Sequence, residues 1–292
     1  MGTKLKKKRI RILGFVGPLI AAVLVAVIVG FTTDRFWSLG NLNNLSLAVS
    51  ITALMAIGST LVIFTGGIDL SIGSMIALIT MAMATLIKFE GWPVIAGLLF
   101  AVILGAILGA FNGLFSAYLK VPSFVATLAG LSIFKGIAYL FNNGSPIFSI
   151  AGNFEMFFYG KLFGIIPLPF IYVAIFYIFF ALFMNYSKFG REIYAVGGNE
   201  IAAKLSGINV KKVKFITFVI AGAMAGVASI LMASRLNKPI GWPRKYNKYS
   251  AWSADNNNST KRTELKRCTD INAKHYNWNY NTGCSANRHV EN

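Results

Sequence analysis

Residues 93–118 read PVIAGLLFAVILGAILGAFNGLFSAY, a stretch in which no side chain carries a charge. About 20 apolar residues are enough for one helix to cross the hydrocarbon core of a membrane. Similar runs fill much of the chain, which is 55% hydrophobic over 292 residues. That composition is too apolar for a soluble domain, which must keep a polar surface in water. The stretch therefore predicts a membrane protein.

Other apolar runs of comparable length lie on both sides of this stretch. Continuous runs such as Leu13 to Phe31 lack the alternating polarity of β-barrel strands. We therefore predict an all-α, polytopic transmembrane helical bundle of about seven spans, the third of which is either a full span or a re-entrant segment. The expected spans are 13–31, 45–64, 70–87, 93–118, 122–141, 165–184 and 213–234.

The positions of lysine and arginine predict which segments face the cytoplasm. Residues 1–12 form a basic N-terminus, and no small-residue cleavage site follows Phe31, so we expect an uncleaved anchor. The loop at 185–214 is also strongly basic. The positive-inside rule places both segments in the cytoplasm, and the even number of predicted spans between them agrees. Because the net charge of +18 lies mainly at span edges and in the tail, it does not indicate nucleic-acid binding.

A polar segment, TGGIDLSIG at 65–73, interrupts an apolar stretch. Gly66 and Gly67 allow the backbone to break, and Asp69 or Ser71 can cap the next helix. An aspartate at membrane depth costs about 2.5 to 3.5 kcal/mol on insertion scales, so Asp69 needs a partner or water. Capping alone explains these residue types, while a broken helix beside a transport path is the alternative.

Lys135 is the second polar residue inside an expected span. A lone lysine near a helix end commonly extends its ammonium group to the membrane surface. Charges inside a membrane also mark transport pathways, so lining of the path stays open as the second interpretation of Lys135.

Glycines recur every fourth residue in two of the expected spans. Small residues at that spacing let transmembrane helices approach closely, so they predict packing and not chemistry. The glycines are Gly105, Gly109 and Gly113 in 93–118, and Gly222 and Gly226 in 213–234.

Residues 197–208, GGNEIAAKLSGI, predict a short helix in the basic loop. Asn199 can cap it, Glu200 suits its first turn, and Gly207 can end it. So short a helix is unstable alone in water and must dock on something. The membrane surface and a groove in a cytoplasmic protein are both suitable partners, and the residues alone do not decide between them. The expected apolar face consists of Ile201, Leu205 and Ile208.

Several separate motifs carry a resemblance to a known family. They are Gly66 to Gly73, VPSFVATL at 121–128, NGSP at 143–146, and Gly190 through Val210. Together they resemble the ribose-type permeases of ATP-binding-cassette (ABC) importers, a family that also serves xylose and galactosides. The likeness covers about residues 10–236 in order.

The resemblance implies a function and a set of partners. We expect a permease subunit in the bacterial plasma (inner) membrane that translocates a monosaccharide, surrounded by lipid and paired with a second permease copy. A solute-binding protein outside delivers the sugar, and an ATPase subunit inside supplies the energy. In this family a short cytoplasmic helix couples the ATPase to alternating access. The matching residues here are Asn199, Glu200, Ala203, Lys204 and Gly207.

The sequence has no glycine-rich phosphate loop ending in Gly-Lys-Ser or Gly-Lys-Thr. We therefore expect a partner subunit to hydrolyse ATP, while the chain itself binds no cofactor and is not an enzyme. A secondary transporter or channel is an alternative, but it would favour several intramembrane acidic residues, and Asp69 stands almost alone. A membrane scaffold is another alternative, and it would need no docking helix.

Residues 237–292 differ abruptly from the expected permease domain at 13–236. They are basic and asparagine-rich, contain no apolar run, and predict a disordered polar tail. Related permeases continue with further membrane helices, so our hypothesis is a frameshift or truncation near Leu236, which would leave a partial and non-functional permease. We expect no metal site, because the tail's candidate ligands lack the usual spacing of zinc ligands. These candidates are Cys268, His275, Cys284 and His289.

Overall fold

The computed structural model describes residues 17, 20–33, 36–148, 150, 161–162 and 166–237. The chain divides into two units, Met1–Pro239 and Ile240–Asn292, and the described residues all belong to the first. The basic N-terminus at 1–12, the tail beyond Asn237 and the candidate metal ligands of that tail lie outside the described residues.

Helices make up nearly all of the described structure, as the apolar runs predict. Two-residue strands form one short antiparallel ladder, with Lys161 opposite Pro167. The elements in chain order are a helix at Ile20–Thr32, α2 (Leu39–Phe64), α3 (Ile72–Lys88), α4 (Val94–Gly113), the π-helix η1 (Leu114–Tyr118), α5 (Ser123–Leu140), the 3-10 turn η2 (Phe141–Gly144), β1 (Lys161–Leu162), β2 (Ile166–Pro167), α7 (Leu168–Tyr186), α8 (Lys188–Gly198), α9 (Glu200–Leu205) and α10 (Val210–Asn237).

Five of the described helices are long and apolar enough to cross a membrane. They are Gly40–Phe64, Val94–Tyr118, Ser123–Gly144, Leu168–Tyr186 and Val210–Leu236. The helix at Ile20–Thr32 and α3 are apolar but shorter. The predicted all-α membrane class is confirmed, whereas the predicted count of about seven spans is not. In α3 the reason is local: the chain is non-helical until Ser71, so only 17 residues remain before Phe89.

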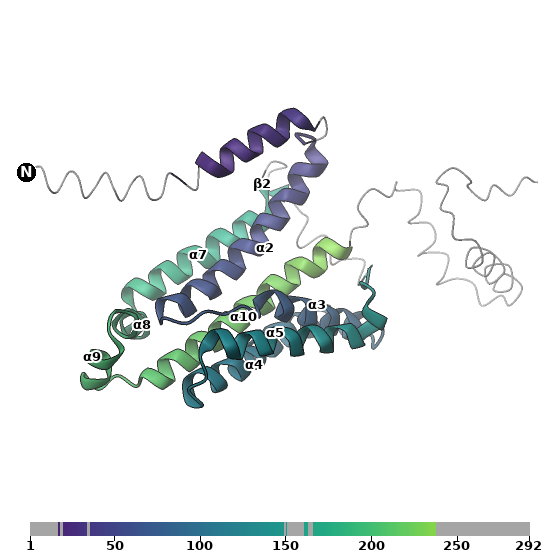
Figure 1. The fold of residues 1–292 in the computed structure, drawn as a ribbon. Helices are drawn as coiled ribbons and strands as arrows, with labels where there is room; N and C mark the ends of the chain where they lie inside the picture. Colours follow the sequence, from purple (N-terminus) through teal and green to yellow (C-terminus); the bar gives the residue numbers. More distant parts are fainter. Residues whose placement is uncertain are drawn as a thin grey trace, which may run out of the picture. The chain divides into compact units, whose positions relative to one another are not determined.

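Helix α10 lies at the centre of the packing. It packs against α4, α2 and α3 (Figure 1). In its most apolar window 61% of the residues are buried, against 11% for α7, so α7 offers most of its surface to the surroundings. A buried hydroxyl also joins α3 to α10, because Thr80 Oγ1 donates to the Ser229 carbonyl at 3.3 Å.

Glycines bring α4 and α10 into backbone contact, as their four-residue spacing predicts. A Cβ atom at Gly109 would collide with the carbonyl oxygen of Phe218, and one at Gly222 would collide with that of Gly105. A Cβ at Gly226 would lie 2.5 Å from the carbonyl oxygen of Ala101. Because there is no space for a side chain along this seam, the two helices pack as closely as their backbones allow.

Segments far apart in sequence meet at one end of the helices. The residues after α2, the residues between η1 and α5, and the α9–α10 turn all line a single pocket. Elsewhere, Lys88 at the end of α3 donates to the carbonyl of Phe148, which follows η2. The connections that line the pocket are alternate ones along the chain. This agrees with a chain whose successive helices cross the membrane in opposite directions, because alternate connections then fall at the same end.

Candidate functional site

The basic loop folds into two consecutive helices, α8 and α9. Ser187 caps α8 by accepting a hydrogen bond from Gly190 N at 2.9 Å. Asn199 has an extended backbone, with φ −158° and ψ 108°, and its side chain accepts from Ala202 N at 3.0 Å, which begins α9 as predicted. Gly207 has φ +82°, a conformation that glycine adopts without strain, and it ends the helical turn as predicted.

Helix α9 has one fixed side and one exposed side. Ala203 is buried in a cluster with Ile193 and Val196 of α8 and Val213 of α10. Glu200 also pairs with Lys214 of α10 at 2.7 Å. These contacts hold a helix that is too short to be stable alone.

The exposed side of α9 is apolar. Ile201 is 74% exposed and Leu205 is 84% exposed. Our prediction that Ile208 shares this face is wrong, because Gly207 turns the chain and Ile208 is partly buried against the cluster around Ala203. The side chains of Ile201 and Leu205 are therefore exposed on a helix whose other side is fixed by contacts with α8 and α10.

Helix α8, which the charge pattern places within a basic loop, rests directly on the end of α2. A Cβ atom at Gly197 would collide with the carbonyl oxygen of Phe64, the last residue of α2. The rings of Phe64 and Tyr194 also contact each other, with centroids 5.3 Å apart. The pattern of Phe189, Ile193 and Val196 at helical spacing is the signal that would have predicted α8.

The polar segment at 65–71 is a break between α2 and α3. Gly66 turns the chain with φ +78°. Ile68 N then donates to Ser123 Oγ at 3.0 Å, and its carbonyl accepts from Thr127 Oγ1 at 3.2 Å, both on α5. The two backbone groups of Ile68 are thus satisfied by a neighbouring helix, as membrane-embedded structure requires.

Asp69 organises the start of α3, though not as the capping residue. Its Oδ1 accepts from Ser71 N at 2.9 Å and from Ser71 Oγ at 2.7 Å. Asn112 of α4 donates from Nδ2 to the same Ser71 Oγ at 2.7 Å. In the described part of the chain, Asp69 Oδ2 and Asn112 Oδ1 are buried without a hydrogen-bond partner. Ser71 occupies the N-cap position of α3, but its side chain makes no capping hydrogen bond, so the predicted side-chain cap is wrong, while the break in the helical chain is present.

Sequence reasoning missed Asn112 and the roles of Ser123 and Thr127. Asn112 is the one amide in the otherwise apolar stretch at 93–118, which is a signal that a buried polar contact exists. Ser123 and Thr127 belong to the motif at 121–128, whose residues alone do not indicate their bonds to Ile68. Lys135 takes no part in this network, because its side chain is exposed on α5.

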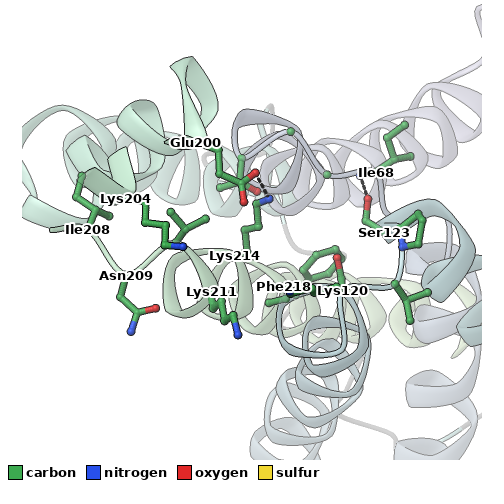
Figure 2. Close-up of a pocket in the computed structure, with 18 of the residues that line it drawn as sticks. Ile68, Lys120, Ser123, Glu200, Lys204, Ile208, Asn209, Lys211, Lys214 and Phe218 are labelled. Carbon is green, nitrogen blue, oxygen red and sulfur yellow. Dashed lines mark hydrogen bonds and ion pairs between the residues drawn. The ribbon is translucent and has the colours of Figure 1, made fainter. Parts of the chain in front are cut away.

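A pocket of about 860 Å³ joins the two predicted segments (Figure 2). Its lining includes five predicted site residues: Gly66, Gly67, Glu200, Lys204 and Gly207. The other five line no part of it: Asp69, Ser71, Lys135, Asn199 and Ala203. Among the described residues, no group of three or more His, Cys, Asp or Glu side chains could hold a metal ion.

Comparisons with known proteins identify relatives over most of the chain. The family described as "Branched-chain amino acid transport system / permease component" matches residues 41–241. The ribose import permease protein of Escherichia coli (strain K12) is 37% identical over 223 residues, which is 75% of this chain and 69% of that protein.

Two further relatives agree with this result. The ribose import permease protein of Bacillus subtilis (strain 168) is 37% identical over 227 residues, covering 76% of this chain and 69% of the relative. The xylose transport system permease protein of Escherichia coli (strain K12) is 31% identical, covering 74% of this chain and 71% of the relative. No solved structure matches the chain.

Proposed function

Since the chain belongs to the ribose-type sugar permease family of ABC importers, we propose that α9 is the helix through which an ATPase subunit drives it. The protein is the membrane permease subunit of a monosaccharide importer and not an enzyme. Its family works with an ATPase and a solute-binding protein. The relatives named above import ribose and xylose, so we propose a ribose-type sugar as the substrate.

The observation that carries this proposal is the exposed pair Ile201 and Leu205 on a helix whose opposite side is fixed. Apolar side chains that project from an anchored helix suit a hydrophobic groove in a partner protein. The anchor also matters, because movement of the partner passes to the permease only if α9 cannot slide. Ala203 and the Glu200–Lys214 ion pair supply that anchor.

The break at 65–71 is proposed to lie beside the sugar path. Discontinuous helices form substrate sites in many transporters, because their free backbone ends can bind polar groups. Gly66, Gly67, Asp69 and Ser71 belong to this segment, and we keep Lys135 as a candidate for the path of the assembled importer. A second permease copy, contacting this chain through its exposed apolar helices, is part of the same proposal. ATP acts on the partner subunit, and no cofactor is assigned to this chain.

Site-directed crosslinking tests the proposed role of α9. Cys268 and Cys284 are first replaced by serine, and Ile201→Cys is then introduced. In membranes supplied with the ATPase subunit of a ribose-type importer, a bifunctional thiol crosslinker should join the chain to that subunit.

The matched control is Ile178→Cys on α7. Ile178 is 61% exposed and Ile201 is 74% exposed, so the two thiols are similarly accessible in the chain. Only the Ile201→Cys variant should capture the ATPase. Capture of the ATPase to the same extent by both thiols, or by neither, would contradict the proposed docking.

A further inference from the structure

The pocket beside α9 carries an unusual charge. Four lysines line it, and Glu200 is the one carboxylate in the lining. Glu200 is already paired with Lys214 at 2.7 Å. In the described part of the chain, no ion pair is found for the other three lysines: Lys120, Lys204 and Lys211. Unneutralised positive charges around a shared concavity attract an anion more strongly than the same charges spread over a surface.

These lysines come from separate parts of the chain. Lys204 lies on α9, Lys211 lies in the first turn of α10, and Lys120 precedes α5. Figure 2 shows Lys204 and Lys211 on the α9–α10 side of the pocket and Lys120 on the other side. An anion bound by lysines from both sides would link α9 and α10 to the segment that precedes α5. Lys120, Lys204 and Lys211 are all exposed, so an anion can reach them from outside the chain.

The rest of the lining indicates the chemistry of the anion. Hydroxyl groups of Ser116 and Ser123 offer neutral hydrogen-bond donors, and apolar side chains such as Phe124 and Phe218 cover another part. Lysine ammonium groups with nearby hydroxyl donors suit the several acceptor oxygens of a phosphate. The volume of about 860 Å³ exceeds the needs of a bare phosphate and leaves space for an attached polar group.

The position of the pocket favours a lipid as the source of this phosphate. The pocket lies where α5 and α10 begin, at the end of the helices that the charge distribution predicts to be cytoplasmic. Headgroups of anionic phospholipids lie at this depth of the membrane, and basic pockets between helices on this side bind them.

We propose that the pocket formed by Lys120, Lys204 and Lys211 binds a phosphate group, with the headgroup of an anionic phospholipid as the favoured source. The bound phosphate holds the start of α10 and α9 against the segment that precedes α5. This proposal does not depend on docking of α9 to an ATPase, because Lys120 and Lys211 lie outside α9.

Native mass spectrometry of the full chain released from detergent tests the proposal. The probes are phosphatidylglycerol, phosphatidylcholine of the same acyl chains, and inorganic phosphate. The wild-type chain should retain phosphatidylglycerol in preference to phosphatidylcholine. Because each lysine contributes to the attraction of an anionic headgroup, Lys120→Gln/Lys211→Gln should weaken this binding about tenfold or more.

The matched control is Lys188→Gln/Lys212→Gln. Both lysines are exposed and lie in the basic loop at 185–214, as Lys211 does, but neither lines the pocket; Lys188 lies 3.9 Å from Glu192, at the limit of an ion pair. The control removes the same net charge, so its binding of phosphatidylglycerol should stay within about twofold of wild type.

Each outcome decides the question. Preferential binding of phosphatidylglycerol that only the pocket variant loses supports the lipid headgroup. Pocket-dependent binding of inorganic phosphate, without preference between the two lipids, supports a soluble phosphate compound instead. Equal binding of both lipids without phosphate binding, or equal losses in both variants, would overturn the proposal.

Discussion

At the scale of single residues, Gly130 leaves the space that Asn112 needs. A Cβ atom at Gly130 would lie 2.5 Å from Asn112 Oδ1, and Asn112 is completely buried. Gly130→Ala should therefore push the Asn112 amide away from Ser71 and weaken the link between α4 and the break at 65–71. We expect a cost of about 1–3 kcal/mol, seen as a lower midpoint of thermal unfolding in detergent.

Gly136→Ala is the control on the same helix. Nothing lies within 4 Å of a Cβ atom at Gly136. Alanine is favoured over glycine in a helix by about 1 kcal/mol, so this variant should keep or raise the unfolding midpoint. If both variants lower the midpoint equally, the contact between Gly130 and Asn112 does not matter for stability.

Individual residues also show what could be predicted from sequence. The roles of Asn199 and Gly207 as the start and end of α9 were predictable, because caps depend on neighbours along the chain. The role of Asn112 was not, because its partner Ser71 lies 41 positions away and only the packing of α4 against the break brings them together. Asp69 lies between these cases: its bond to Ser71 is local, while its burial is not.

At the scale of helices, the α4–α10 seam depends on the absence of side chains. Gly109→Ala would place a methyl group against the carbonyl oxygen of Phe218, and a backbone atom cannot rotate away. The helices must separate, at a cost of about 1–3 kcal/mol. We expect a lower unfolding midpoint in detergent and more rapid proteolysis of the purified chain.

Gly73→Ala on α3 provides the comparison for this seam. Gly73 is also helical, and a Cβ atom there would meet nothing within 4 Å. The same substitution should therefore be tolerated at Gly73. If Gly109→Ala lowers the unfolding midpoint no more than Gly73→Ala does, close backbone contact is not what holds α4 to α10.

Helix-scale predictions succeeded where the pattern was long and uniform. The apolar runs predicted five of the membrane helices, and the glycine spacing predicted close packing of α4 and α10, though not that these two helices meet. Helix α8 was not predicted because its charged residues are typical of a basic loop. Its apolar residues form a buried face only because α2 and α10 cover them. Ile208 was misassigned because the turn at Gly207 changes the direction of the chain.

At the scale of the whole molecule, charge and packing predict the same topology. The basic loop was assigned to the cytoplasm from its charges, and the pocket places Gly66 and Lys120 at the same end as α9. Glu90, in the connection between α3 and α4, should then face the opposite side. In a chain with Cys268 and Cys284 replaced by serine, an impermeant maleimide should label Glu90→Cys in intact spheroplasts.

Lys188→Cys completes the topology experiment. Lys188 is exposed on α8 and should react with the same maleimide only in inside-out vesicles. Labelling of both thiols from one side would require an odd number of additional crossings between residues 90 and 188. It would contradict the proposed alternation of successive helices across the membrane. The number of spans could not be predicted from hydropathy alone, because the break at 65–71 shortens α3.

The contact between Gly197 and the carbonyl of Phe64 has a mechanical consequence. Close-packed interiors resist compression, and here main chain rests on main chain with no pliable side chain between them. A tilt of α8 should therefore displace the last turn of α2, because no side chain at this contact can yield. If α9 is the docking helix, movement of the partner should therefore reach α2 through this contact.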